Sequence, residues 1–302
     1  MIISASRRTD IPAFYSDWFM NRIKAGFVMT RNPFNSKQIR QISLLPADVD
    51  VIVFWTRNAF PMLKHLNLLD EMGYRYYFQY TITGYPRPLE TATLHPLKAI
   101  DNFIKLSQQI GKEKVIWRYD PILLCNLLPA EEHIRLFSRI AGLLQGYTTR
   151  VVVSFADFYK KTERNLRGVG DLTVSDITQN REQHSELSKA LSQIAAAHEM
   201  EIFSCSEKVI DPEHDIPHGA CIDAALIEKL FHLHVSVKKD KNQRTECLCA
   251  QSVDIGAYNT CVHGCQYCYA TYHHQQAVRN YKQHDPDSPF LLNPAELIPV
   301  RY

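Results

Sequence analysis

The chain has 302 residues, of which 45% are hydrophobic and 22% charged, as is typical of a soluble globular protein. No apolar run approaches the roughly 20 residues of a membrane-spanning helix, and the opening Met1-Ile-Ile-Ser-Ala-Ser-Arg-Arg lacks the order of a secretory signal, so we expect a cytoplasmic protein. The 34 basic and 32 acidic residues give a net charge of +2. This charge is too small for the protein as a whole to attract the nucleic-acid backbone electrostatically.

Strand and helix patterns alternate along the chain. Short β-branched and aromatic runs predict strands at residues 2–4, 51–55, 76–82, 114–119, 150–155 and 201–204. Apolar residues at helical spacing predict helices over residues 60–72, 96–110, 130–145, 181–199 and 223–233. This alternation predicts an α/β fold with a parallel sheet, either open and doubly wound or closed. We favour a (β/α) barrel, TIM-like or partial.

Polar side chains gather at or just after these strands. They are Arg8, Asp10, Thr56, Asn58, Gln79, Arg118 and Asp120. In a (β/α) barrel the C-terminal strand ends form one rim, and that rim carries the site. Arg118 lies within an otherwise apolar strand, where a charge needs a partner or a ligand. We therefore predict a catalytic role for Arg118 and Asp120, and predict that the other side chains hold a cofactor or the substrate.

The cysteines divide into scattered and clustered ones. Cys125, Cys205 and Cys221 are scattered, whereas Cys247, Cys249, Cys261, Cys265 and Cys268 share one C-terminal stretch. In a cytoplasmic chain cysteines stay reduced, so a cluster of them indicates metal or redox chemistry. No repeat or Gly/Ser linker divides the chain. We expect a barrel domain over residues 1–235 and, over residues 236–302, a cysteine-rich segment that binds an iron-sulfur cluster and packs on the barrel.

Cys261, Cys265 and Cys268 have the spacing C-x3-C-x2-C. Three thiolates in a short loop can hold three irons of a 4Fe-4S cluster, because soft sulfur ligands suit such clusters. The fourth iron then keeps an open position, which suits a cluster that binds a small molecule. A cluster that only transfers electrons normally has four protein thiolates.

The segment Cys261-Val-His-Gly-Cys265-Gln-Tyr267-Cys268 resembles the C-x3-C-x-aromatic-C signature of the radical S-adenosylmethionine superfamily. The ending Tyr-Cys-Tyr-Ala and the run Val51 to Asn58 resemble the spore photoproduct lyase-like branch. The whole chain, from Ser-Ala-Ser-Arg-Arg-Thr-Asp-Ile-Pro to the C-terminal cysteines, resembles a bacterial family described only as a domain of unknown function, number 1848.

The superfamily resemblance implies a partial or complete barrel and a 4Fe-4S cluster whose open iron chelates S-adenosylmethionine. It implies reductive cleavage of that cofactor to methionine and a 5'-deoxyadenosyl radical, a reductant such as flavodoxin or ferredoxin, and contact of Tyr267 with the adenine. The sequence departs from the superfamily pattern in two ways: the cysteine loop follows the predicted strands instead of the first one, and the chain has no Gly-Gly for a methionine-binding motif.

Other functions stay open at the level of sequence. A fourth cysteine ligand would make a non-catalytic iron-sulfur protein, and zinc would make a metal-stabilised barrel that acts on a small polar metabolite through Arg118 and Asp120. The candidates to complete a zinc site are His263, His273, His274, Cys247 and Cys249. The last two cysteines either bind a second metal or are reduced thiols. The resemblance to the spore photoproduct lyase-like branch implies nucleic acid as a further substrate class. The balance of basic and acidic residues does not support this class.

Overall fold

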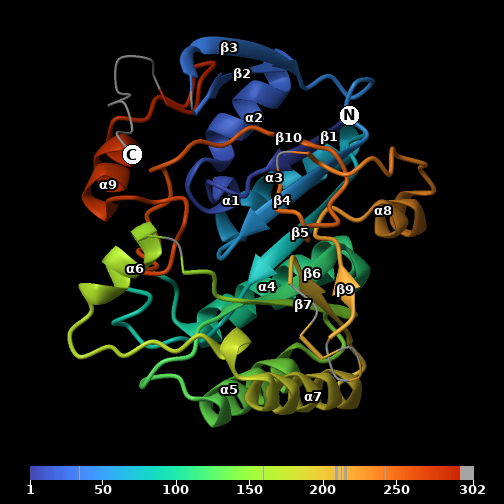
Figure 1. Ribbon diagram of the computed structural model, residues 1–302. Coiled ribbons are helices and arrows are strands. Elements are labelled where there is room, and N and C mark those ends of the chain that lie inside the picture. Colours follow the sequence, from blue (N-terminus) through green and yellow to red (C-terminus); the bar gives the residue numbers. More distant parts are fainter. Residues whose placement is uncertain are drawn as a thin grey trace.

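A computed structural model describes residues 1–33, 35–158, 160–207, 210–211, 213, 216–241 and 243–292. An eight-stranded sheet with the order β10-β1-β4-β5-β6-β7-β8-β9 lies at its centre (Figure 1). All neighbouring strands in this sheet are parallel. The strands are β1 (Ile2–Ala5), β4 (Val51–Thr56), β5 (Tyr76–Thr81), β6 (Val115–Ile122), β7 (Arg150–Phe155), β8 (Glu201–Cys205), β9 (His218–Gly219) and β10 (Val253–Asp254).

The sheet is an open half-barrel. Strands β9 and β10 form its two edges, and within the described residues no backbone pairing joins one edge to the other. Each edge strand has two residues, which is too short to close a barrel by a hydrogen-bonded ladder. The α/β class and the partial form of the barrel are confirmed, whereas the closed TIM-like form is not found.

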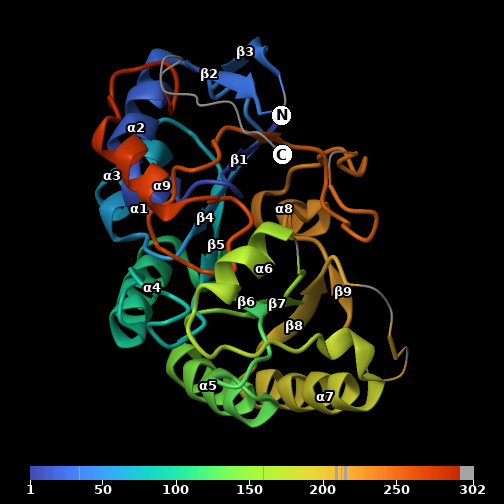
Figure 2. The same cartoon turned by 60° about the vertical axis from the view of Figure 1, so that its left-hand side comes forward.

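The outer side of the sheet is covered by helices (Figure 2). The described residues form α-helices on both sides of the sheet: α1 (Ile11–Phe14), α2 (Ser16–Ala25), α3 (Phe60–Glu71), α4 (Pro96–Ile110), α5 (Ala130–Leu144), α6 (Lys160–Arg167), α7 (Arg181–Ala197), α8 (Ala224–Phe231) and α9 (His274–Lys282). In Figure 2, helices α1 to α5 and α7 form an arc along the left and lower side of the molecule. No helix among the described residues is both long and apolar enough to cross a membrane.

Helix α4 illustrates why the sequence predicted the helices well. Pro96 stands at its first position, where a missing N–H costs nothing, and Gly111 caps its C-terminus. The buried residues Ile100, Phe103 and Ile110 recur at helical spacing and face the core. The predicted strands and helices are confirmed with small differences at their ends.

The elements that the sequence did not predict lack such a pattern. An antiparallel hairpin of β2 (Phe27–Asn32) and β3 (Asn35–Ser43) lies apart from the main sheet. Strands β9 and β10 and helices α1, α2, α6 and α9 were also not predicted. In β3 the side chains described are polar except for Ile39 and Ile42, which do not alternate with polar residues in the period of a strand. Helix α1 has only four residues, too few to show a helical period.

The two faces of the sheet bury different cores because side chains alternate along each strand. On β4, Ile52 and Phe54 belong to the large core beneath the outer helices. Val51 and Val53 point the other way, into a second core that contains residues of α8 and of the segment 247–250. We call this second side the inner face.

The inner face becomes polar toward the C-terminal ends of the strands. On β6, Ile116 lies in the inner core, and the next inner residues, Arg118 and Asp120, line a cavity. On β7, Val152 is followed in the same way by Ser154. The strand period of two therefore puts apolar residues at one end of the inner face and polar ones at the other.

Strand β10 brings the C-terminal part of the chain into the sheet. It pairs with β1 in the register Ile3 with Val253 and Ser4 with Asp254. Asp254 accepts hydrogen bonds from Ser6 Oγ at 2.7 Å and from the backbone N–H of Arg7 at 2.9 Å. The cysteine loop after residue 254 thus starts beside the first strand. The division at residue 235 stays a prediction.

His133, in α5, is a buried titratable group of the outer core. Its Nε2 donates to the carbonyl oxygen of Leu123 at 3.1 Å, so its Nδ1 accepts from Tyr119 OH at 2.9 Å. Burial lowers the pKa of His133 from 6.5 to about 4. The folded state therefore holds the neutral ring, while the unfolded chain takes up a proton below pH 6.5.

We expect the free energy of unfolding to decrease as the pH falls from 7 to 5, with His133 accounting for about 2 kcal/mol of the loss. The decrease levels off below a pH of about 4, where both states bind the proton. Urea unfolding at pH 7 and pH 5, on the wild type and on His133→Gln, measures this. The Gln variant keeps hydrogen-bonding groups but cannot titrate, so an equal pH dependence in both proteins would contradict the assignment.

Candidate metal centre

A cavity of about 400 Å³ opens at the C-terminal ends of the inner strands. Among the side chains predicted to form the site, those that line it are Arg8, Asp10, Thr56, Arg118, Asp120, Cys261, Cys265, Tyr267 and Cys268. They come from the loops after β1 and β10, from the last residue of β4 and from β6. The parallel sheet thus brings together residues from both ends of the sequence, as expected for the rim of a (β/α) barrel.

Asn58 and Gln79 do not line this cavity. Asn58 Oδ1 accepts from the N–H of Phe60, at the start of α3, at 3.1 Å and from Asn102 Nδ2 at 3.1 Å. Gln79 Nε2 donates to the carbonyl oxygen of Cys221 at 2.8 Å. Both side chains position neighbouring parts of the chain, and their contact with a cofactor stays a prediction.

Asp10 fastens the cysteine loop to the first part of the chain. Its Oδ2 accepts from His263 Nε2 at 2.7 Å and from the N–H of Arg57 at 2.7 Å. Its Oδ1 caps helix α1 by accepting from the N–H of Ala13 at 3.0 Å. One carboxylate therefore holds together the cysteine loop, the start of α1 and the turn after β4.

Gly264 allows the cysteine loop to lie against residues 89–92. Its φ of 69° is in the left-handed region, and an added Cβ would stand 2.1 Å from Thr91 Oγ1. The carbonyl oxygen of Gly264 accepts from the N–H of Thr91 at 3.3 Å, and Gln266 N–H donates to the carbonyl oxygen of Leu89 at 2.9 Å. Both the backbone conformation and the lack of space for a Cβ therefore explain why a glycine lies between the first two cysteines of the motif.

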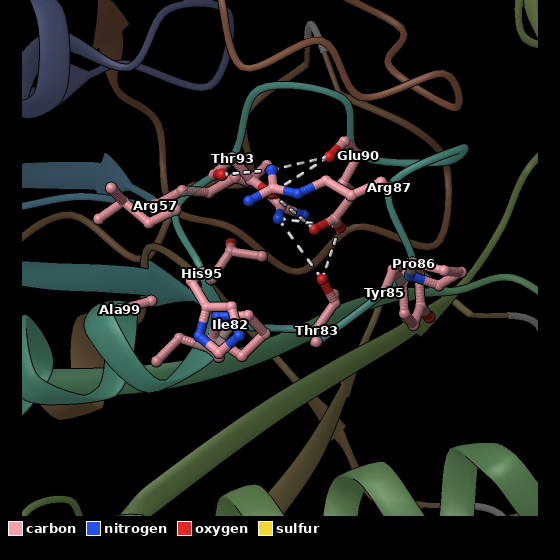
Figure 3. A pocket seen from close by; sticks show the side chains of 14 residues that line it. Arg57, Ile82, Thr83, Tyr85, Pro86, Arg87, Glu90, Thr93, His95 and Ala99 are labelled. Carbon is pink, nitrogen blue, oxygen red and sulfur yellow. Dashed lines mark hydrogen bonds and ion pairs between the residues drawn. The ribbon is translucent and has the colours of Figure 1, made fainter.

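A buried ion pair lies next to this loop, beside a second cavity of about 240 Å³ (Figure 3). Arg57 Nη1 is 2.9 Å from Glu90 Oε1, and Thr83 Oγ1 donates to the same oxygen at 2.6 Å. Arg57 Nη2 donates to Tyr267 OH at 2.6 Å, and that hydroxyl donates to Glu90. Burial opposes the charge of Arg57, but Cys265 and Glu90 together raise its pKa well above the usual value. A permanent cation thus stands beside Cys265.

Arg118 and Asp120 form the second buried ion pair of the cavity. Arg118 Nη2 and Nε donate to Asp120 Oδ2 at 2.6 and 3.2 Å, and Ser154 donates to the other oxygen. Burial opposes ionisation of Asp120, yet Arg118 and the Ser154 hydroxyl keep its pKa below the usual value. The partner expected for a charge within this strand is therefore present. The catalytic role of the pair stays a prediction.

The remaining basic residues of the rim are also engaged. Arg8 Nη2 is 3.0 Å from Asp254 Oδ1, so it ties the loop after β1 to β10. The guanidinium carbons of Arg7 and Arg118 lie 5.3 and 5.1 Å from the ring centre of Trp55. Trp55 lines the cavity, whereas Trp117 is fully buried in the outer core.

Cys261, Cys265 and Cys268 are free and partly exposed to the cavity. Burial raises the pKa of Cys265 to about 12 and that of Cys261 well above its usual value. Metal binding would therefore have to displace thiol protons. Among the described residues, no three His, Cys, Asp or Glu side chains are arranged to hold a single metal ion.

The side chains considered as further zinc ligands lie elsewhere or have other partners. His263 is bonded to Asp10, and His273 and His274 line a separate cavity of about 310 Å³. Cys247 and Cys221 act on Cys249 and lower its pKa. Within the described part of the chain, none of these side chains completes a metal-binding set with the cysteines of the loop.

Several residues of the candidate site were not predicted from the sequence. Cys205 and Cys221 are scattered in the sequence, yet both line the cavity together with Cys247 and Cys249. Cys205 directly follows the strand predicted at residues 201–204 and ends the observed β8, so its position at the rim could have been inferred. Glu90 follows an irregular, proline-containing stretch that carries no periodic signal.

We expect Glu90→Gln to lower the free energy of unfolding by about 3 kcal/mol, because it leaves the largely buried Arg57 without its counter-charge. Urea denaturation would measure the change. The matched control is Asp101→Asn, which removes the exposed partner of Lys98 and should leave the unfolding midpoint nearly unchanged. Equal effects of the two substitutions would contradict the importance of the buried pair.

Comparison with protein families identifies the family of this chain. A family model described as "Domain of unknown function (DUF1848)" matches residues 2–270, a range that includes all strands of the main sheet and every cysteine. No curated protein matches the chain. Because the match covers most of the sequence, the chain belongs to the DUF1848 family.

Proposed function

We propose that the protein is a radical S-adenosylmethionine-type enzyme that binds a 4Fe-4S cluster through Cys261, Cys265 and Cys268. The observation that carries the proposal is that this C-x3-C-x2-C loop follows β10 and turns its cysteines into the cavity at the C-terminal end of a parallel half-barrel. The family name states no activity, so the proposal rests on the loop and its place in the fold.

The position of β10 supports the proposal despite the late position of the motif in the sequence. The resemblance implies a cysteine loop after the first barrel strand. Here β10 lies at the edge of the sheet beside β1, so the loop is next to the first strand in space although it comes last in the chain. Parallel strands bring all their C-terminal ends to one rim, and the cavity there is shared by β4, β6 and β7.

The surroundings of the loop favour an open iron over a closed cluster. A cluster for electron transfer alone normally has a fourth cysteine ligand. The other cysteines of the cavity contact one another, and His263 is bonded to Asp10. A 4Fe-4S cluster with S-adenosylmethionine supplies an electron and a 5'-deoxyadenosyl radical. The protein would position both and keep out water.

The geometry suggests different tasks for the predicted cofactor residues. Tyr267 lines the cavity with its hydroxyl held by Arg57 and Glu90, which leaves the ring as the surface for the adenine. Asp10 uses one oxygen to hold the loop and the other to cap α1, so it acts as a positioning residue. Arg8 and Thr56 remain the candidates for contact with the ribose or the carboxylate.

The substrate side of the cavity is polar. Arg118, Asp120 and Ser154 lie on the inner strands there. Ion pairs aligned in a partly closed cavity can orient a small polar molecule through hydrogen bonds. We propose such a substrate, with a flavodoxin or ferredoxin as reductant. The net charge of +2 gives no support to nucleic acid.

After anaerobic reconstitution with iron and sulfide, we expect the wild type to show a 4Fe-4S EPR signal that changes when S-adenosylmethionine is added. With dithionite it should form 5'-deoxyadenosine. Cys265→Ala should lose both the change in the signal and the product, because one of the three thiolates is missing.

Cys125→Ala is the matched control, since Cys125 is buried and lies outside the cavity. It should behave as the wild type. A signal that does not respond to S-adenosylmethionine in the wild type, or a response that survives in Cys265→Ala, would refute the proposal.

We expect Tyr267→Ala to weaken binding of S-adenosylmethionine about tenfold, the size of an aromatic stacking contact. Anaerobic calorimetric titration of the reconstituted protein measures this affinity. Tyr267→Phe keeps the ring but loses the hydrogen bonds to Arg57 and Glu90. It should bind more tightly than the Ala variant, and equal losses in both variants would show that the ring is not the contact.

A further inference from the structure

Four cysteines outside the C-x3-C-x2-C loop meet on the inner face. They are Cys205, Cys221, Cys247 and Cys249, and we call them the cysteine quartet. All four are buried and line the same cavity as the loop. The first two are separated from the last two by α8 and the segment after it, so the quartet exists only in the folded chain.

The quartet sulfurs are in contact. Cys221 Sγ donates to Cys205 Sγ at 3.0 Å, and the N–H of Ile222 donates to Cys249 Sγ at 3.4 Å. The neighbouring thiols of Cys221 and Cys247 act on Cys249 and lower its pKa. The four thiols thus form one connected group.

The backbone around the quartet is held in place. The carbonyl oxygen of Cys221 accepts from Tyr77 OH and from Gln79 Nε2, both at 2.8 Å. The N–H of Ala250, next to Cys249, donates to the carbonyl oxygen of Ile222 at 2.9 Å. These bonds fix the two chain segments against β5 and against each other, so the thiols are presented by a rigid frame.

Two guanidinium groups stand beside the quartet. Arg118 Nη1 donates to Cys221 Sγ at 2.7 Å. Burial opposes the charge of Arg7, whereas Cys249, Asp254 and Cys221 raise its pKa. Its Nη2 is buried and has no hydrogen-bond partner within the described residues. Negative charge on the quartet would stabilise this buried nitrogen further, and four thiols supply that charge when they lose their protons.

We propose that the cysteine quartet is a second metal centre, in which four thiolates bind a thiophilic metal. Four-thiolate sites hold either tetrahedral zinc or a closed 4Fe-4S cluster. Binding displaces the thiol protons and leaves a net negative centre, which Arg7 and Arg118 offset. This centre goes beyond the proposed function and does not depend on it.

The quartet sulfurs have to move apart when metal binds. In tetrahedral zinc with bonds of about 2.3 Å, the sulfurs stand about 3.8 Å from one another, and in a 4Fe-4S cluster they stand further apart. The Cys221 to Cys205 distance is 3.0 Å, and the described side chains hold no ready site for a single ion. The adjoining cavity of about 400 Å³ gives room for this expansion.

The test uses a triad variant, Cys261→Ala/Cys265→Ala/Cys268→Ala, which leaves the quartet intact. It is reconstituted anaerobically with iron and sulfide in one arm and with Zn²⁺ alone in the other. We expect about four irons with four sulfides, or about one zinc, per chain. Adding Cys221→Ala/Cys249→Ala to the triad variant should abolish this binding, whereas adding Cys125→Ala should not change it.

A second measurement does not require the additional variant to fold. Bound metal should protect the four quartet cysteines of the triad variant from alkylation by N-ethylmaleimide, as mapped by peptide mass spectrometry. The proposal is overturned if the triad variant binds neither metal, or if binding leaves the quartet reactive. The proposed function is tested separately, because it requires the response to S-adenosylmethionine that the triad variant lacks.

Discussion

Strand β10 pairs with β1 through two residues, and the position of the candidate site depends on this contact. Asp254 reinforces it by accepting from Ser6, from the N–H of Arg7 and from the side chain of Arg8. This interaction starts the cysteine loop beside the first strand, and the bond between His263 and Asp10 holds the loop there. A carboxylate with several charge-assisted hydrogen bonds can hold such a short edge strand where the ladder alone could not.

The cavity is built from charges that neutralise each other in pairs. Arg57 pairs with Glu90, Arg118 with Asp120 and Arg8 with Asp254. Arg57–Glu90 and Arg8–Asp254 each join separate segments of the chain, whereas Arg118 and Asp120 both lie on β6, so the rim is polar yet held in one arrangement. Buried pairs contribute little to net stability, but they orient their groups, and removing one partner is costly. This arrangement is what a site needs when it must hold a charged cofactor in a set position.

Two groups of cysteines share this cavity but arise in different ways. The cysteines of the loop are close in sequence, and Gly264 and Asp10 hold the loop against its surroundings. The quartet comes from the end of β8, from the turn before α8 and from the segment after α8. In the proposed enzyme the loop would leave one iron open for chemistry, whereas the quartet would enclose its metal completely.

The sequence by itself determined the six longer strands of the main sheet, five of the helices, the parallel α/β class and the three-cysteine motif, because each depends on residues close together in the chain. The sequence also predicted that Arg118 has a charged partner or a ligand, since its charge interrupts an apolar strand. The tertiary structure alone decided that the barrel stays open, that Glu90 reaches Arg57, and that Cys205 and Cys221 meet Cys247 and Cys249. These features depend on contacts between segments that are distant in the sequence. Strands of two residues and irregular loops show no periodic pattern, so the sequence does not indicate where they pack.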